Sequence, residues 1–156
     1  MERELLLQQL REAREFFRRS TECLEPGDAG STPADGMMTA AQQVAHVAAT
    51  VDWFREGAFD PDGFNMDFEQ HMAQLQDVTT LEAAREWLDR AFDQVMTLFA
   101  EASMEELSAP IEDDTIMSGE PRFNIVAGIV DHTAHHRGAL TVYSRLAGRT
   151  PAMPYM

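Results

Sequence analysis

The segment LEAAREWLDRAFDQVMTLFAEA, residues 81–102, has the most regular apolar pattern of the chain. Its apolar residues recur at intervals of three and four, which is the spacing of one face of an α-helix. These residues are Leu81, Ala84, Leu88, Ala91, Val95, Leu98 and Ala102. The sequence Thr79-Thr80-Leu81-Glu82 fits a capping box, which marks a helix start. The segment therefore predicts an amphipathic helix of about six turns, whose apolar face needs partner helices.

Three other segments have helical patterns of similar length. They cover residues 2–20, 39–58 and 121–147. A capping box at Thr39-Ala40-Ala41-Gln42 opens the second of them, and Pro121 suits the first turn of the last. Gly148 is expected to stop that last helix. Because no segment alternates apolar and polar residues as a strand does, we predict an all-α fold, a four-helix bundle.

The connections between these helices are long. Residues 25–37 are rich in Gly, Pro, Ser and Asp, and Asp60-Pro61-Asp62-Gly63 breaks the second helix. We predict a short extra helix at 64–76 and a loop at 103–120 with one helical turn near 104–107. Crossover loops of this length leave the order of the helices in the bundle open. The whole chain, residues 1–156, is expected to form a single domain.

Composition excludes several classes of function. The chain has 27 acidic and 12 basic residues, all of them arginine, for a formal charge of −15. We expect neither non-specific nucleic-acid binding nor docking on an anionic membrane, because both require a basic surface. The single Cys23 excludes an intrachain disulfide and a zinc site of several thiolates. The start of the chain lacks a secretory pattern and no apolar run reaches ~20 residues, so we expect a soluble, cytoplasmic protein.

Three of the five histidines lie within Asp131-His132-Thr133-Ala134-His135-His136-Arg137-Gly138, inside the last predicted helix. Residues four apart on a helix are stacked neighbours, so His132 and His136 can aim at one point. Both histidines lie on the apolar face of the helix, which is defined by Ile125, Ile129, Leu140 and Tyr143. His135 lies at one edge of that face. Two inward imidazoles need hydrogen-bond partners or a metal ion.

A third metal ligand should come from a facing helix. His46 lies in mid-helix among apolar neighbours, whereas His71 lies in a polar segment, so we choose His46 over His71. The helix around His46 is apolar nearly all round, and its phase does not indicate the direction of that side chain. The alternative is that these histidines are core residues satisfied by ordinary hydrogen bonds. The bare pattern leaves both interpretations open.

Four other residues have weaker functional interpretations. Asp52 and Asp131 are candidates to orient a ligand histidine, or are solvated charges on a helix surface. Trp53 lies seven residues after His46 and is either a pocket wall or a core aromatic. Arg137 is a candidate anchor for an anionic group, but it points away from the direction of His136, and a structural ion pair is the favoured interpretation.

The stretch His132-Thr133-Ala134-His135-His136-Arg137-Gly138-Ala139-Leu140 resembles the His-x-x-x-His-Arg-Gly-Gln-Leu helix of the DinB-like (DinB/YfiT) superfamily. The closing segment Tyr143-Ser144-Arg145-Leu146-Ala147-Gly148, with Pro151 and Pro154-Tyr155, is also similar, and His46 matches the first ligand of that family. The likeness spans nearly the whole chain. Its specific motifs are confined to the last helix, the tail and the region of His46. Ala139 departs from the pattern where glutamine is common.

The resemblance implies a four-helix bundle that binds a divalent metal, commonly nickel or zinc, through His46, His132 and His136. It also implies a homodimer and, as in some relatives, a transferase or isomerase that uses a low-molecular-weight thiol such as mycothiol or bacillithiol. We therefore expect a metal-dependent thiol S-transferase acting on a small electrophile, with catalytic residues that the sequence does not identify. The alternative is a non-catalytic metal-binding or dimeric interaction module in a stress response.

Overall fold

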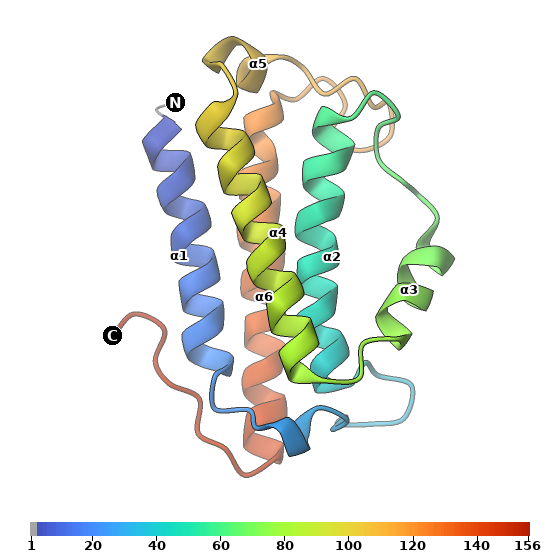
Figure 1. The fold of residues 1–156 in the computed structure, drawn as a ribbon, viewed down its shortest axis with the longest axis vertical. Helices are drawn as coiled ribbons and strands as arrows, with labels where there is room; N and C mark the ends of the chain where they lie inside the picture. Colours follow the sequence, from blue (N-terminus) through green and yellow to red (C-terminus); the bar gives the residue numbers. More distant parts are fainter. Residues whose placement is uncertain (1–2) are drawn as a thin grey trace.

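The computed structural model describes residues 3–156, and this part of the chain is helical and contains no β-strand. Its α-helices are α1 (Arg3–Thr21), α2 (Ala40–Phe59), α3 (Phe68–Gln76), α4 (Leu81–Glu101), α5 (Met104–Ser108) and α6 (Ile125–Leu146). Two short 3-10 helices, η1 (Pro26–Asp28) and η2 (Arg122–Asn124), precede α2 and α6. The four long helices α1, α2, α4 and α6 form a bundle (Figure 1). The predicted fold class is confirmed.

The helices are not arranged in sequence order around the bundle. Helices α1 and α2 each pack against both α4 and α6, so α1 and α2 occupy opposite corners. Figure 1 shows that α1 and α6 run in one direction and that α2 and α4 run in the other. Neighbours α2 and α4 are therefore parallel, and the segment containing α3 returns the chain along the side of α2 to the end where α4 begins.

Several element bounds differ from the prediction. The short extra helix begins at Phe68, and the last helix becomes regular only at Ile125, because Pro121 opens the 3-10 turn η2. The predicted helical turn after residue 103 is present as α5. The expected first residue of the first helix, Glu2, lies outside the described residues.

One of the two predicted capping boxes is present. Thr39 accepts a hydrogen bond from the backbone N–H of Gln42, whose side chain accepts one from the N–H of Thr39. The box predicted from Thr79 is wrong by one residue, because Thr80 is the N-cap of α4 and accepts from the N–H of Ala83. Alanine has no side-chain acceptor to return the bond, so this end has a single cap.

The apolar stripe of α4 faces the core. Leu81, Ala84, Leu88, Ala91 and Val95 are buried, whereas Leu98 is only partly buried. The fully buried aromatic residues of this helix, Phe92 and Phe99, lie beside the predicted stripe. A helix in contact with two neighbours buries an arc wider than a single seam, and the large side chains at its margin are included.

Gly128 leaves room for the Phe54 ring where α2 and α6 pack together. A Cβ atom built there would lie 2.7 Å from Cζ of Phe54, so a larger residue would require that ring to shift. Gly128 lies four residues, about one turn, before His132. The contact therefore brings the histidine-bearing part of α6 near α2.

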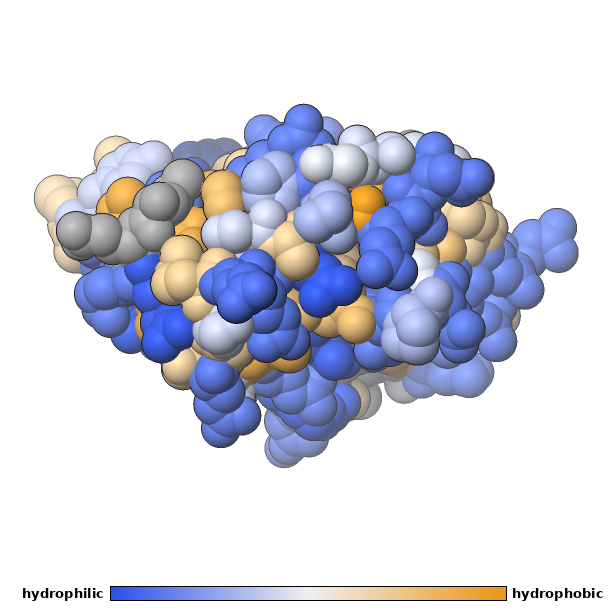
Figure 2. All heavy atoms as spheres, turned by 90° about the horizontal axis from the view of Figure 1, so that it is seen from above, coloured by the Kyte–Doolittle hydropathy of each residue, from blue (hydrophilic) through white to orange (hydrophobic). Residues whose placement is uncertain are grey.

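The surface of the bundle end where α1 begins is shown in Figure 2. Hydrophilic residues predominate there, with hydrophobic residues interspersed among them. This agrees with the large excess of acidic residues in the chain. Within the described residues, no helix is both long enough and apolar enough to cross a membrane.

Candidate metal centre

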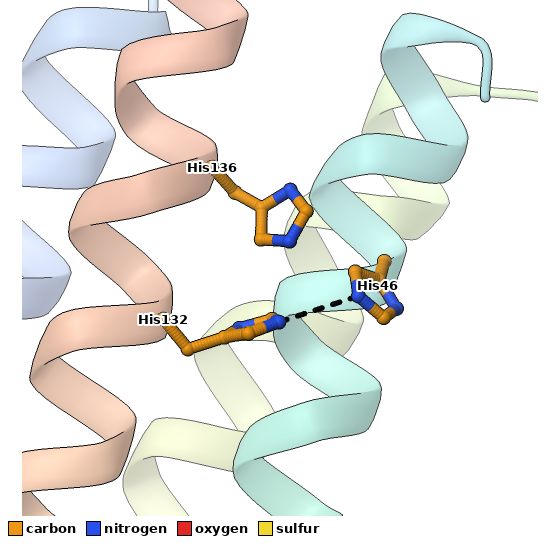
Figure 3. A group of neighbouring side chains, drawn as sticks. All are labelled: His46, His132 and His136. Carbon is orange, nitrogen blue, oxygen red and sulfur yellow. Dashed lines mark hydrogen bonds between the residues drawn. The ribbon is translucent and has the colours of Figure 1, made fainter. Parts of the chain in front are cut away.

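Three histidines from two helices meet between α2 and α6 (Figure 3). His46 projects from α2, and His132 and His136 project from successive turns of α6. One ligand nitrogen from each lies within 4.8 Å of the other two. His136 is 8% exposed and the other two are partly buried, whereas His135 is exposed. The structure thus brings together the three residues chosen from sequence and leaves His135 outside the group.

The spacing of these nitrogens suits a metal ion. The Nε2 atoms of His46 and His132 are 3.3 Å apart. Two nitrogens bound to one tetrahedral zinc ion at ~2.0–2.1 Å would be separated by about 3.3 Å. A direct hydrogen bond between the two rings would give a similar distance, with one ring donating and the other accepting. The donor set, three imidazoles, suits zinc, nickel, copper and iron.

Burial keeps these imidazoles neutral. Desolvation lowers the pKa of His136 to about 3, helped by the nearby rings of His132, His46 and His135. Desolvation also lowers the pKa of His132 to about 4, helped by His46 and His135 and opposed by Asp131. The pKa of His46 is lowered as well, first by burial and then by His135. Because a metal binds the unprotonated ring, the group is ready for a metal at neutral pH without prior loss of protons.

We expect the metal-free protein to lose stability as the pH falls from about 6.5 to about 4. The unfolded chain binds protons at histidines of ordinary pKa, ~6.5, whereas folded His132 and His136 do so only near pH 4 and 3. The unfolded state therefore binds more protons in this window, and acidification favours it. Thermal unfolding midpoints at pH 7, 6 and 5 would show the fall.

The matched control for this pH series is His132→Gln, which cannot titrate. Its unfolding midpoint should fall less between pH 6.5 and 5 than that of the parent chain. Carboxylates such as Asp113 lose their contribution to folding stability only at lower pH, so they do not affect this comparison. The pKa of Asp113 is lowered by hydrogen bonds from the backbone N–H groups of Ile116, Phe64 and Thr115. An equal slope for the variant and the parent chain would contradict the assignment.

Gln43 holds His136 in one tautomer. Its Oε1 lies 2.6 Å from Nδ1 of His136, and a carbonyl oxygen only accepts, so Nδ1 carries the proton. Nε2 of His136 therefore keeps its lone pair for a metal. The Gln43 amide group donates in turn to the hydroxyl of Tyr143 at 3.4 Å, and that hydroxyl donates to the carbonyl of Met38 at 2.8 Å. This chain of hydrogen bonds sets the orientation of the amide.

Sequence reasoning missed Gln43. It lies three residues before His46, on the same face of α2, and this spacing was the available signal. The two acidic candidates for this orienting role do not contact the histidines: Asp52 accepts from the indole N–H of Trp87 at 2.8 Å, and Asp131 is exposed. The hydroxyl of Thr50 lies 3.4 Å from Nε2 of His132, which is the nitrogen that faces His46 and not the one that an orienting partner would contact.

The histidine group borders a cavity of about 720 Å³. His46 and His132 line it on one side, and residues of α3 line it on the other. The walls also include Trp53, Phe54, Phe68, His71, Met72 and Leu75. Among the described residues that line it, Asp131 is the only carboxylate and there is no arginine. His71 is thus a wall residue outside the histidine group, and Trp53 is a pocket wall.

No curated protein matches the chain by sequence. Among solved structures, the chain is similar to YfiT from Bacillus subtilis, which is described as a probable metal-dependent hydrolase with an unusual four-helix bundle topology. The two structures have a TM-score of 0.72 and 17% sequence identity, and the match covers 95% of this chain and 89% of YfiT. That likeness shows the fold. The sequence profile of the DinB family matches residues 1–156, and this chain therefore belongs to the DinB family.

Proposed function

We propose that this protein is an enzyme that depends on a divalent metal ion, held by His46, His132 and His136. The observation that carries the proposal is the meeting of three neutral imidazoles beside a largely apolar cavity. Three protein ligands leave coordination positions for a small molecule, as in catalytic rather than structural zinc sites. A bound zinc or nickel ion would supply a Lewis acid that lowers the pKa of a coordinated water or thiol.

The residues around the metal centre have distinct roles in this proposal. Gln43 keeps Nδ1 of His136 protonated and its Nε2 available. Trp53, Phe54 and Phe68 exclude water and hold the apolar part of the substrate. No arginine lines the described part of the cavity, so the substrate we propose is a small, uncharged electrophile rather than an anion.

Two nucleophiles fit this site. The family resemblance favours a low-molecular-weight thiol, which makes the protein a thiol S-transferase. The description of YfiT as a probable hydrolase favours water as the second candidate. The transferase and hydrolase reactions would use the same metal and cavity, and they differ in whether a thiol is consumed.

The test begins with elemental analysis of the chain expressed without an affinity tag, followed by assays of the zinc- and nickel-loaded protein. An activated aryl halide is offered with and without a thiol, and an aryl ester is offered without one. Product formed only with the thiol supports the transferase, and ester cleavage without thiol supports the hydrolase. One metal per chain with neither activity would favour the non-catalytic metal-binding module. A chain that takes up no metal would overturn the proposal.

We expect Phe68→Ala to raise the KM for an apolar substrate by about tenfold, because a buried aromatic contact contributes about 1.5 kcal/mol. Phe68 is 56% exposed in the substrate-free cavity, so its loss should cost little stability. Steady-state kinetics of the metal-loaded variant measure the effect. Leu146→Ala is the control, since Leu146 is 67% exposed and lies outside the cavity. A raised KM in the control, or none in Phe68→Ala, would contradict this role.

The homodimer implied by the family resemblance remains a proposal as well. Sedimentation equilibrium of the purified chain would measure its mass in solution. A monomer at all concentrations would remove the dimeric interaction module as an alternative function.

A further inference from the structure

A second cavity lies on the α1 side of α6. It has a volume of about 520 Å³ and lies between α1, α6 and the C-terminal residues. Its lining includes Glu12 and Phe16 of α1, Asp131, Thr133 and Arg137 of α6, and Tyr155. It shares the wall residues Asp131 and Ala134 with the cavity beside the metal centre, but none of the described histidines lines it.

Thr133 presents an unsatisfied hydroxyl group at this cavity. The residue is 1% exposed, and its Oγ1 has no hydrogen-bond partner within the described chain. Other hydroxyl groups of α6 bond to a carbonyl of their own helix, as Ser144 does to Leu140 at 2.8 Å. Buried hydroxyl groups rarely lack a partner, so the Thr133 hydroxyl has an unmet hydrogen bond in a residue that lines the cavity.

Arg137 presents a guanidinium group without an anionic partner in residues 3–156, although the chain has 27 acidic residues. The structural ion pair favoured from sequence is thus not found there. The guanidinium lies 5.8 Å from the ring centroid of Phe16 and 5.9 Å from that of Tyr155. Arg145, on the same helix, instead donates to the carbonyl of Thr141 at 2.9 Å. Aromatic faces hold Arg137 in place and leave its donors free.

The aromatic wall is anchored to α1. Phe16 and Tyr155 form an edge-to-face pair with ring centroids 5.0 Å apart. Arg19 donates to the carbonyl oxygens of Pro154 and Met156, each at 3.2 Å, which attaches the chain on both sides of Tyr155. The cavity therefore combines a positioned cation, an apolar wall and a buried hydroxyl group.

We propose that this cavity binds a small monocarboxylate that carries an aromatic or branched apolar group. The planar guanidinium of Arg137 matches a carboxylate in two parallel hydrogen bonds, and the Thr133 hydroxyl donates a third. Phe16 and Tyr155 pack against the apolar group. Glu12 and Asp131 are also exposed at this cavity, so they would repel a ligand with two negative charges more strongly than a monocarboxylate. This site goes beyond the proposed function.

The test is isothermal titration of the metal-loaded full chain with benzoate, and with benzamide as its uncharged analogue. We expect one benzoate per chain, bound at least about tenfold more tightly than benzamide. Arg137→Met and Thr133→Val should each weaken benzoate binding by about tenfold or more, the loss expected for a charge-assisted hydrogen bond. Arg145→Met is the matched control on the same helix and should leave benzoate affinity unchanged. Thermal melts confirm that each variant is folded.

Two results would overturn the proposal. One is the absence of benzoate binding at millimolar concentration by the parent chain. The other is benzoate binding that Arg137→Met retains at full affinity. If removal of the metal then abolishes that binding, the carboxylate binds the metal instead of this cavity. Since Arg137 and Thr133 lie outside the histidine group, loss of this site leaves metal uptake and the proposed function unaffected. Failure of the two proposals is therefore distinguishable.

Discussion

Replacing His132 by alanine is expected to abolish stoichiometric metal binding. Nε2 of His132 lies 3.3 Å from Nε2 of His46, and one ring nitrogen of His136 completes the group. Without His132, only two imidazoles from different helices remain, and two ligands do not make a stable site. The loss of affinity should exceed the 10–100-fold typical of removing an orienting partner. Elemental analysis of tag-free protein, with titration of zinc into the metal-free chain, measures it.

The control for this experiment is His135→Ala. His135 is adjacent to His136 in sequence but exposed and outside the group of three. This variant should retain one metal per chain. Full metal content in His132→Ala would remove His132 from the ligand set, and with it the proposed centre.

The second large effect is expected for Gln43→Leu, which should weaken metal binding by about 10–100-fold. Leucine has nearly the same size but no oxygen to accept the hydrogen bond that Nδ1–H of His136 donates to Oε1 of Gln43 at 2.6 Å. The ring then loses the bond that fixes its tautomer and orientation. Zinc titration measures the affinity, and ¹⁵N resonances of His136 report which ring nitrogen is protonated.

Gln43→Glu distinguishes an orienting role from simple packing. A carboxylate still accepts from Nδ1 of His136, so this variant should keep most of the metal affinity that Gln43→Leu loses. Tyr143→Phe should have a smaller effect, because Tyr143 contacts the far side of the Gln43 amide. Equal affinities for Gln43→Leu and the parent chain, with an unchanged His136 tautomer, would show that Gln43 has no part in positioning the ligand.

The helices of this protein follow from local pattern, but their arrangement does not. The apolar repeat over residues 81–102 and the Thr39 capping box mark real helices, because helix formation depends on spacing and on groups a few residues apart. Helix α3 begins at Phe68 rather than at residue 64, because Asp67 is its N-cap and accepts a hydrogen bond from the backbone N–H of Gln70. The parallel pairing of α2 with α4 could not be predicted, since any two apolar helix faces can bury each other.

The candidate site is likewise predictable from the sequence only in part. The phase of α6 alone directs His132 and His136 inward and His135 outward, because the apolar residues of one helix define its buried face. The direction of His46 could not be read from α2, which is apolar nearly all round and packs against both α4 and α6. The sequence also does not show that His71 lies in a cavity wall outside the histidine group.

By itself, the sequence determined an acidic helical bundle with two imidazoles aimed at its interior from one helix. Only the tertiary structure decided that His46 completes the group, that Gln43 fixes the tautomer of His136, and that Arg137 faces a cavity instead of an acidic partner. The physical reason is the separation along the chain of the residues that determine each feature. Helical phase depends on neighbours within one or two turns, whereas a metal centre or a binding cavity depends on the approach of helices far apart in the chain.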